Sequence, residues 1–164
     1  MRKTLEFIVS GTEVTRFHTV TTLVRETVGH HSHGVAMMVL LMNPHASGSL
    51  LRAALMHDLA EHQTGDIPSP AKREYNIGDQ VNELERRLML EAGIEYPELT
   101  AEDYRTLKLA DIAQGAVFCM REMSLGNQRM DRILNRYMEY AEQLNPVGRE
   151  RDLFETIEEM TWDL

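Results

Sequence analysis

The chain has 164 residues, a formal net charge of −9 and a single cysteine. This length suits one domain with a sizeable core, so we expect a single domain over residues 1–164. The acidic balance opposes binding of a nucleic acid polymer, because phosphate backbones are bound by clustered Lys and Arg. It does not exclude a small anion, since a few local cations can dominate the field inside a cleft. The lone Cys119 excludes an internal disulfide and favours a cytoplasmic location, and the longest apolar run, residues 35–42, is too short to span a membrane.

Helical periodicity runs through the chain, without an alternating strand pattern or an internal repeat. We therefore predict an all-α fold, a compact helical bundle. A first helix is expected over residues 4–22, although Gly11 and several β-branched residues weaken it. The next helix begins near Ser32 and ends at Asn43-Pro44, because proline disfavours the helical conformation in the residue before it. Its apolar residues cover all sides, which predicts a central position in the fold.

Two further helices are expected in the middle of the chain. The first covers residues 47–62 and ends before Thr64-Gly65, where glycine suits the left-handed cap position. The second opens at Ser69-Pro70, with serine as the N-cap and proline as the first helical residue, and it ends near Gly93. An interruption is expected at Gly78.

The last third of the chain predicts three helices. Thr100, followed by an aspartate three residues later, resembles a capping box and opens a long helix that ends before Gly126. Amphipathic helices follow over residues 130–144 and 149–162, separated by an Asn-Pro pair. Their arginines and glutamates are expected to face solvent, and their apolar stripes to face the core.

Residues 57–66, with the sequence HDLAEHQTGD, concentrate two histidines and three carboxylates. On a helix, His57 and Glu61 lie on one face, whereas Asp58 is rotated by about 100° from His57. Adjacent His and Asp side chains can still bind one metal ion over the edge of a helix. The zinc-peptidase pattern H-x-x-E-H does not fit, because Glu61 and His62 come one position too late.

Other potential ligands lie far from this stretch in the sequence. His30, His31 and His33 precede the central apolar helix, and Asp111 interrupts the apolar residues 107–120. A buried carboxylate needs a partner, which can be an arginine, a helix N-terminus or a metal ion. Because three separate segments each offer an imidazole or a carboxylate, we favour a metal site.

The order His31, His57-Asp58 and Asp111 resembles the H…HD…D signature of the HD-domain metal-dependent phosphohydrolases. The sequence is most similar to the branch that contains bacterial 5′-deoxynucleotidases and small phage dATP triphosphohydrolases. The small size and the short connection between Asp58 and Asp111 look more like the phage enzymes. The similarity covers about residues 16–127 and includes Arg16-Phe17, His31-Ser32, HDLAEHQTGDIPSPAK and KLADIAQGAVFCMREMSLGN.

The resemblance implies that four residues bind the metal, namely His31, His57, Asp58 and Asp111. This mixed nitrogen and oxygen set suits Zn, Co or Mn, and Fe or Mg less well. His31 is preferred over its neighbours because it precedes Ser32 in the histidine-serine pair of the family.

The resemblance also implies catalytic and substrate-binding roles. Glu61 would be the general acid/base and Asp66 a second catalytic carboxylate. Arg16 and Lys72 would bind the phosphate or the sugar, and Phe17 would stack on the base or the sugar. From the residue types alone, Arg16 and Lys72 would be expected in solvent and Phe17 in the core.

The implied function is hydrolysis of a deoxynucleotide. The favoured reaction converts dATP or another dNTP to deoxynucleoside and triphosphate, by attack of an activated water at the α-phosphate, in the host cytoplasm if a phage encodes the chain. The alternative is a 5′-deoxynucleotidase that hydrolyses dNMP. A noncatalytic helical interaction module stabilised by metal is less well supported, because Glu61 and Asp66 are both intact. Relatives commonly form dimers or rings, so we expect a homo-oligomer.

Overall fold

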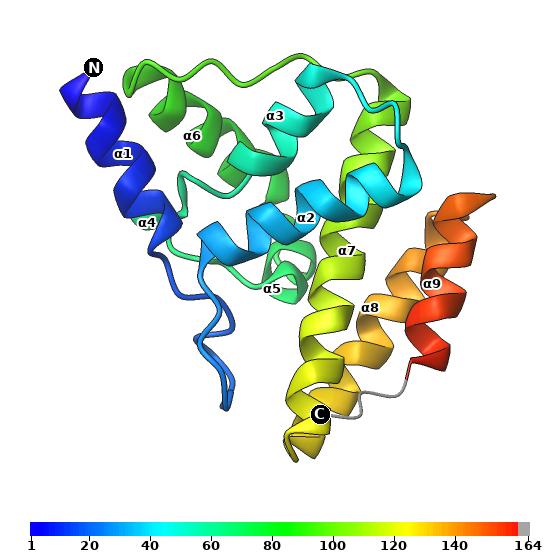
Figure 1. Cartoon of the computed structure of the whole chain (residues 1–164). Helices are drawn as coiled ribbons and strands as arrows, with labels where there is room; N and C mark the ends of the chain where they lie inside the picture. The colour runs from blue at the N-terminus through cyan, green and yellow to red at the C-terminus, as the bar shows by residue number, and fades with distance from the viewer. Residues whose placement is uncertain (161–164) are drawn as a thin grey trace.

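The computed structural model describes residues 1–160, and its regular secondary structure is helical (Figure 1). Between these residues no strand forms beyond one isolated bridge, Thr15 with Thr27. The all-α prediction is confirmed. The elements are α1 (Arg2–Thr12), α2 (Val28–Met42), α3 (Gly48–Met56), α4 (Glu61–Thr64), α5 (Ser69–Glu74), α6 (Gly78–Glu91), α7 (Ala101–Ser124), the short 3-10 helix η1 (Gln128–Met130), α8 (Asp131–Gln143) and α9 (Arg149–Glu159).

Helix α7 runs through the middle of the molecule and packs against α2, α3, α8 and α9 (Figure 1). Two glycines allow its closest contacts. A Cβ on Gly34 of α2 would lie 2.7 Å from Cγ of Gln114, and a Cβ on Gly115 would lie 2.6 Å from Cζ of Tyr137 on α8. Because these two positions have no side chain, Gln114 can pack directly on α2 and Tyr137 can pack directly on α7.

Helix α1 ends at Thr12, so the helix predicted over residues 4–22 is wrong beyond that point. The following backbone pairs across a hairpin instead of along a helix: the N–H of Arg16 donates to the carbonyl of Glu26, and that of Val28 donates to the carbonyl of Val14. We call residues 13–27 the hairpin. On α1 itself, Phe7 and Gly11 are buried. The exposed side chains Leu5, Ile8 and Val9 form what we call the α1 apolar face.

Helix α2 begins at Val28, four residues before the predicted start. The side chain of Thr27 is its N-cap and accepts from the N–H of His30, and the helix ends at Asn43 as predicted. The helix contacts α1, α3, α7 and α9. It is not covered on all sides, however, because Met37 and Leu41 are about half exposed.

The helix predicted over residues 47–62 is interrupted. Helix α3 ends at Met56 with His57 as its C-cap, and residues 57–60 form a turn before α4. The interruption predicted near Gly78 is confirmed, since α5 and α6 are separated by residues 75–77, with Asn76 in the left-handed region at φ 51°. A helix broken at His57 can direct two adjacent side chains to one point, which a continuous helix does poorly.

The signals at the ends of α7 act as predicted. The Thr100 hydroxyl accepts from the N–H of Asp103 at 3.0 Å, and Gly126, at φ 103°, follows the last turn. Helix α9 ends at Glu159 with Met160 as its C-cap, and the last two residues of its predicted range, including Trp162, lie outside the described residues. In the described part of the chain, no helix is long and apolar enough to cross a membrane.

Candidate metal and substrate site

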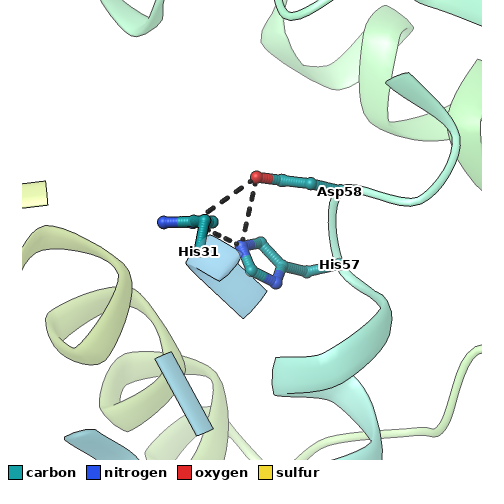
Figure 2. Close-up of side chains that lie close together, drawn as sticks. All are labelled: His31, His57 and Asp58. Carbon is teal, nitrogen blue, oxygen red and sulfur yellow. Dashed lines mark hydrogen bonds and ion pairs between the residues drawn. The ribbon is translucent and has the colours of Figure 1, made fainter. Parts of the chain in front are cut away.

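Three of the predicted ligands meet where the end of α3 approaches α2 (Figure 2). His31 is fully buried on α2, and His57 and Asp58 begin the turn that follows α3. The two Nε2 atoms are 3.2 Å apart, and Oδ2 of Asp58 lies 3.6 Å from that of His31 and 3.3 Å from that of His57. One ligand atom from each residue lies within 4.8 Å of the others, so the three side chains can hold one metal ion.

The outer nitrogens of both imidazoles are held by hydrogen bonds. Nδ1 of His57 donates to the carbonyl of Ala54 at 2.8 Å, and Nδ1 of His31 donates to Oε1 of Gln114. These bonds assign the tautomers, because a ring that donates from Nδ1 presents a lone pair at Nε2. Two Nε2 lone pairs that face each other repel unless a cation lies between them. The donor set therefore fits a divalent metal ion on chemical grounds as well as on distance.

Asp111 approaches the same point from α7. Its Oδ1 is 3.2 Å from Nε2 of His31, while its Oδ2 accepts from Nζ of Lys108 at 2.8 Å. Burial alone would raise the pKa of Asp111, but the positive charge of Lys108 lowers it well below its usual range. This carboxylate thus stays ionised beside the triad, and it has the cationic partner that a buried carboxylate requires.

A second layer of polar side chains supports His31. Nε2 of Gln114 donates to Oε1 of Glu26 at 2.7 Å, and both residues are less than a tenth exposed. Glu26 also lies 3.4 Å from Nε of Arg16. A buried chain of hydrogen bonds therefore runs from Glu26 through Gln114 to His31 at the candidate metal site. The sequence analysis did not identify Glu26 and Gln114, because a single glutamate and a single glutamine belong to no recognisable motif.

A pocket of about 270 Å³ opens beside these residues. Asp58, Asp111 and all five predicted catalytic and substrate-binding residues line it, while His31 and His57 lie outside the lining. Glu61 begins α4 and is 4% exposed, and its Oε2 has no hydrogen-bond partner. Burial, together with the charges of Asp58 and Asp66, raises the pKa of Glu61 to about 10. The raised pKa favours the carboxylic acid form of Glu61, whose side chain lies against the pocket.

The hairpin brings Arg16 and Phe17 into the site. Nη1 of Arg16 donates to Oδ2 of Asp58 at 2.6 Å, and the Arg16 side chain is only 10% exposed. Phe17, at φ 56°, stacks on Phe118 of α7 with ring centroids 4.8 Å apart. The expectation of a solvated Arg16, based on residue type alone, is wrong, because its guanidinium is buried against a carboxylate. Phe17 has its expected apolar partner and also faces the pocket.

The remaining predicted residues lie on the segment after α4. Asp66 has Oδ2 3.7 Å from Nδ1 of His18, and Nζ of Lys72 on α5 is 3.9 Å from Oε1 of Glu85. Three further cations that the sequence reasoning did not identify also line the pocket, namely Arg73, Lys108 and Arg136. They come from three different helices, so only the folded chain brings them together.

The class of this protein follows from a match to a family model. The family model described as HD domain matches residues 13–108, more than half of the chain, and the chain belongs to the HD-domain family. The matched range contains His31, His57 and Asp58 and ends three residues before Asp111. This finding confirms the family predicted from the sequence.

A solved structure similar to this chain is that of the HD phosphohydrolase DatZ of cyanophage S-2L, bound to dA and one catalytic Zn²⁺ ion. The TM-score is 0.67 at 19% sequence identity, over 94% of this chain and 96% of DatZ. This likeness establishes a shared fold. Among curated proteins, no sequence matches the chain.

Proposed function

We propose that the chain is a metal-dependent deoxynucleotide phosphohydrolase that converts a dNTP, in particular dATP, to deoxynucleoside and triphosphate. The observation that carries the proposal is a set of possible metal ligands placed beside the buried Glu61 at the wall of a pocket that cations line. The ligands of DatZ, dA and a catalytic Zn²⁺ ion, support the choice of substrate class and metal. We further propose that the protein acts in the cytoplasm, where deoxynucleotides are made and used.

His31, His57 and Asp58 would hold the metal ion, with Asp111 as a further ligand. The nitrogen and oxygen donors suit Zn, Co or Mn, and Fe or Mg less well. A divalent ion bound there would neutralise phosphate charge and make a water molecule more acidic. Asp111 could bind the metal through Oδ1 while Oδ2 keeps its hydrogen bond from Lys108, because its two oxygens already face in these two directions.

The proposed reaction breaks the bond between the α-phosphorus and the 5′-oxygen. Water supplies the oxygen that forms the new bond to phosphorus and releases a proton, while the 5′-oxygen takes up a proton as it leaves. The raised pKa of Glu61 favours its protonated form, and Glu61 is the group that we assign to donate this proton. The proton released by water restores the acid for the next turnover. Arg16 would bind the α-phosphate through its planar fork while it orients Asp58, and Asp66 would lie beside the attacked phosphorus.

The choice of a triphosphate rests on the positive charge of the pocket. Arg16 and Lys72 are joined there by Arg73, Lys108 and Arg136. A monophosphate needs fewer cations than a triphosphate, whose two additional phosphates must also be neutralised. The alternative, a 5′-deoxynucleotidase, uses the same attack on the same phosphorus and leaves Arg73 and Arg136 without a phosphate to bind.

The test is product analysis of Zn²⁺-loaded protein with dATP and, separately, with dAMP, by anion-exchange chromatography with phosphorus detection. Deoxyadenosine and tripolyphosphate from dATP would support the proposal. Orthophosphate from dAMP, with dATP left intact, would replace it with the 5′-deoxynucleotidase. An Arg136→Ala variant sharpens the choice, because we expect it to weaken turnover of dATP more than turnover of dAMP.

Glu61→Gln tests the catalytic assignment. We expect turnover to fall by about 10²–10⁴-fold while Zn²⁺ binding and thermal stability stay close to wild type. Glu74→Gln, an exposed position on α5, is the matched control. Loss of Zn²⁺ binding in Glu61→Gln would show that Glu61 acts on the metal site, and unchanged turnover would remove Glu61 from the mechanism.

A further inference from the structure

Glu122 is a fully buried carboxylate near the end of α7 that the proposed mechanism does not use. Its two oxygens accept from the backbone N–H groups of Leu23 and Val24, each at 2.7 Å. Nδ2 of Asn127 also donates to it, at 2.7 Å. In residues 1–160 no Lys, Arg or His forms an ion pair with Glu122. The hydrogen bonds from Asn127 and the two amides outweigh the effect of burial and lower the pKa of Glu122, which keeps it ionised.

The two amides bound by Glu122 belong to the hairpin, which also carries Arg16 and Phe17. Leu23 and Val24 lie 99 and 98 residues from Glu122 in the sequence, so these contacts join two segments that are far apart along the chain. On the other side of the hairpin, Phe17 stacks on Phe118, which precedes Glu122 by one helical turn on α7. A single stretch of α7 therefore contacts both sides of the hairpin.

The way in which α7 ends places Asn127 beside Glu122. The N–H of Asn127 donates to the carbonyl of Glu122 and that of Gly126 donates to the carbonyl of Met123, which is the pattern of a Schellman motif. The chain turns back on itself at Gly126, with φ 103°. The Asn127 side chain can then reach both Oε2 of Glu122 and, at 2.9 Å, the carbonyl of Thr21 in the hairpin.

We propose that Glu122 is a positioning residue: together with Asn127 it clamps the backbone of residues 21–24 to α7 and thereby holds Arg16 and Phe17 in the substrate pocket. The proposal rests on the proposed function for the roles of Arg16 and Phe17, but the clamp itself is independent of them. A carboxylate suits this task because it offers acceptors on both oxygens to three neighbouring donors. A neutral amide at position 122 would present an NH₂ group to at least one of the backbone amides, and that amide would lose its acceptor.

The experiment compares Zn²⁺-loaded wild type with Glu122→Gln, Asn127→Ala and the control Glu102→Gln, which removes an exposed glutamate from the other end of α7. Hydrogen exchange of the Leu23, Val24 and Arg16 amides is measured by NMR without nucleotide. KM and kcat are then measured with whichever of dATP and dAMP is hydrolysed. Zn²⁺ affinity is measured by competition with a chelator.

We expect the three amides to exchange at least about tenfold faster in Glu122→Gln, because the hairpin opens locally. We expect KM to rise by about tenfold and kcat to change by less than about threefold, as follows from loss of substrate positioning. Asn127→Ala should change the exchange rates and KM in the same direction but by a smaller factor. If Glu122→Gln does not fold, the result for Asn127→Ala tests the proposal. Zn²⁺ affinity and the Glu102→Gln control should match wild type.

Wild-type exchange rates at the three amides in both variants would overturn the proposal. Faster exchange with an unchanged KM would also overturn the proposal, because the clamp would then have no effect on how Arg16 and Phe17 bind the substrate. A wild-type protein that hydrolysed neither nucleotide would refute only the proposed function. In that case the exchange rate of the Arg16 amide, which donates to Glu26 inside the hairpin, still decides whether Glu122 holds Arg16 in place.

Discussion

Replacement of Gln114 by methionine should weaken metal binding although Gln114 touches no metal ion. The amide links Glu26 to Nδ1 of His31 and thereby fixes the ring with Nε2 toward Asp58 and His57. Methionine is unbranched and of similar length, so it can lie against Gly34, where the Gln114 side chain packs tightly now. It removes both hydrogen bonds while it keeps most of the packing.

The size of the effect follows from the burial of the three groups. Glu26 is 6% exposed and His31 is 0% exposed, so water cannot replace the lost amide. A hydrogen bond to a charged group contributes about 1.5–3 kcal/mol, and that to Glu26 is of this kind. We expect the metal-free protein to lose about 2–4 kcal/mol of unfolding free energy. Loss of an outer partner of a ligating histidine typically weakens metal affinity by about 10–100-fold, and we expect a change in this range.

Competition between the protein and a chromogenic Zn²⁺ chelator measures the affinity, and urea denaturation of the metal-free protein measures stability. Gln143→Met, an exposed position on α8, is the control and should behave as wild type in both assays. A Zn²⁺ dissociation constant within about twofold of wild type would refute the reasoning, because the amide would then have no part in orienting His31.

Three other predictions test packing, reactivity and assembly. Gly115→Ala should lower unfolding free energy by about 1–3 kcal/mol in urea, because its methyl group would lie 2.6 Å from the Tyr137 ring; an unchanged midpoint would contradict this contact. Cys119 is buried and its thiol has a pKa raised to about 12 by burial, so iodoacetamide should modify it only after unfolding; modification at the rate of a free thiol would show an open core. We also predict a homo-oligomer, which would bury the α1 apolar face, and light scattering that found only monomer at micromolar concentration would be evidence against it.

Local signals predicted several helix ends correctly. Asn43 before proline, the Thr100 cap and Gly126 each act within a few residues of themselves, so their effect can be read from the sequence alone. The all-α class of the fold was predicted from the helical periodicity of the apolar residues along the chain. These ends also position functional groups, because the turn at Gly126 brings Asn127 to Glu122.

Two helices were predicted in the wrong form, and both errors lie at the site. The segment after Thr12 leaves the helix because Arg16 and Val28 pair across the hairpin and because Glu122, almost 100 residues away, binds Leu23 and Val24. Hydrogen bonds between residues so far apart in the sequence leave no pattern of neighbouring residues from which they could be predicted. The break after Met56 has no strong sequence signal either, since residues 57–62 contain neither proline nor glycine.

For the site itself, the family signature was more informative than residue chemistry. His31, His57 and Asp58 converge, and the other predicted residues line the adjoining pocket, while their individual roles stay predictions. Residue type alone placed Arg16 in solvent, whereas the structure buries it against Asp58. Gln114, Glu26 and Lys108 were not foreseen, because each acquires its role from a partner that only the folded chain supplies.

The metal triad also has a consequence for how much of this protein a cell contains. His31 on α2 and His57 in the turn after α3 are 26 residues apart, so an ion bound between them would be a crosslink between separate parts of the chain. Such a ligand stabilises the folded state by about 2.7 kcal/mol when its free concentration is 100 times its dissociation constant. That is a large share of the about 5–15 kcal/mol by which a typical domain is stable. Scarcity of the metal would therefore expose the chain to proteases, and the supply of a trace element would set the abundance of the protein as well as the rate at which each molecule works.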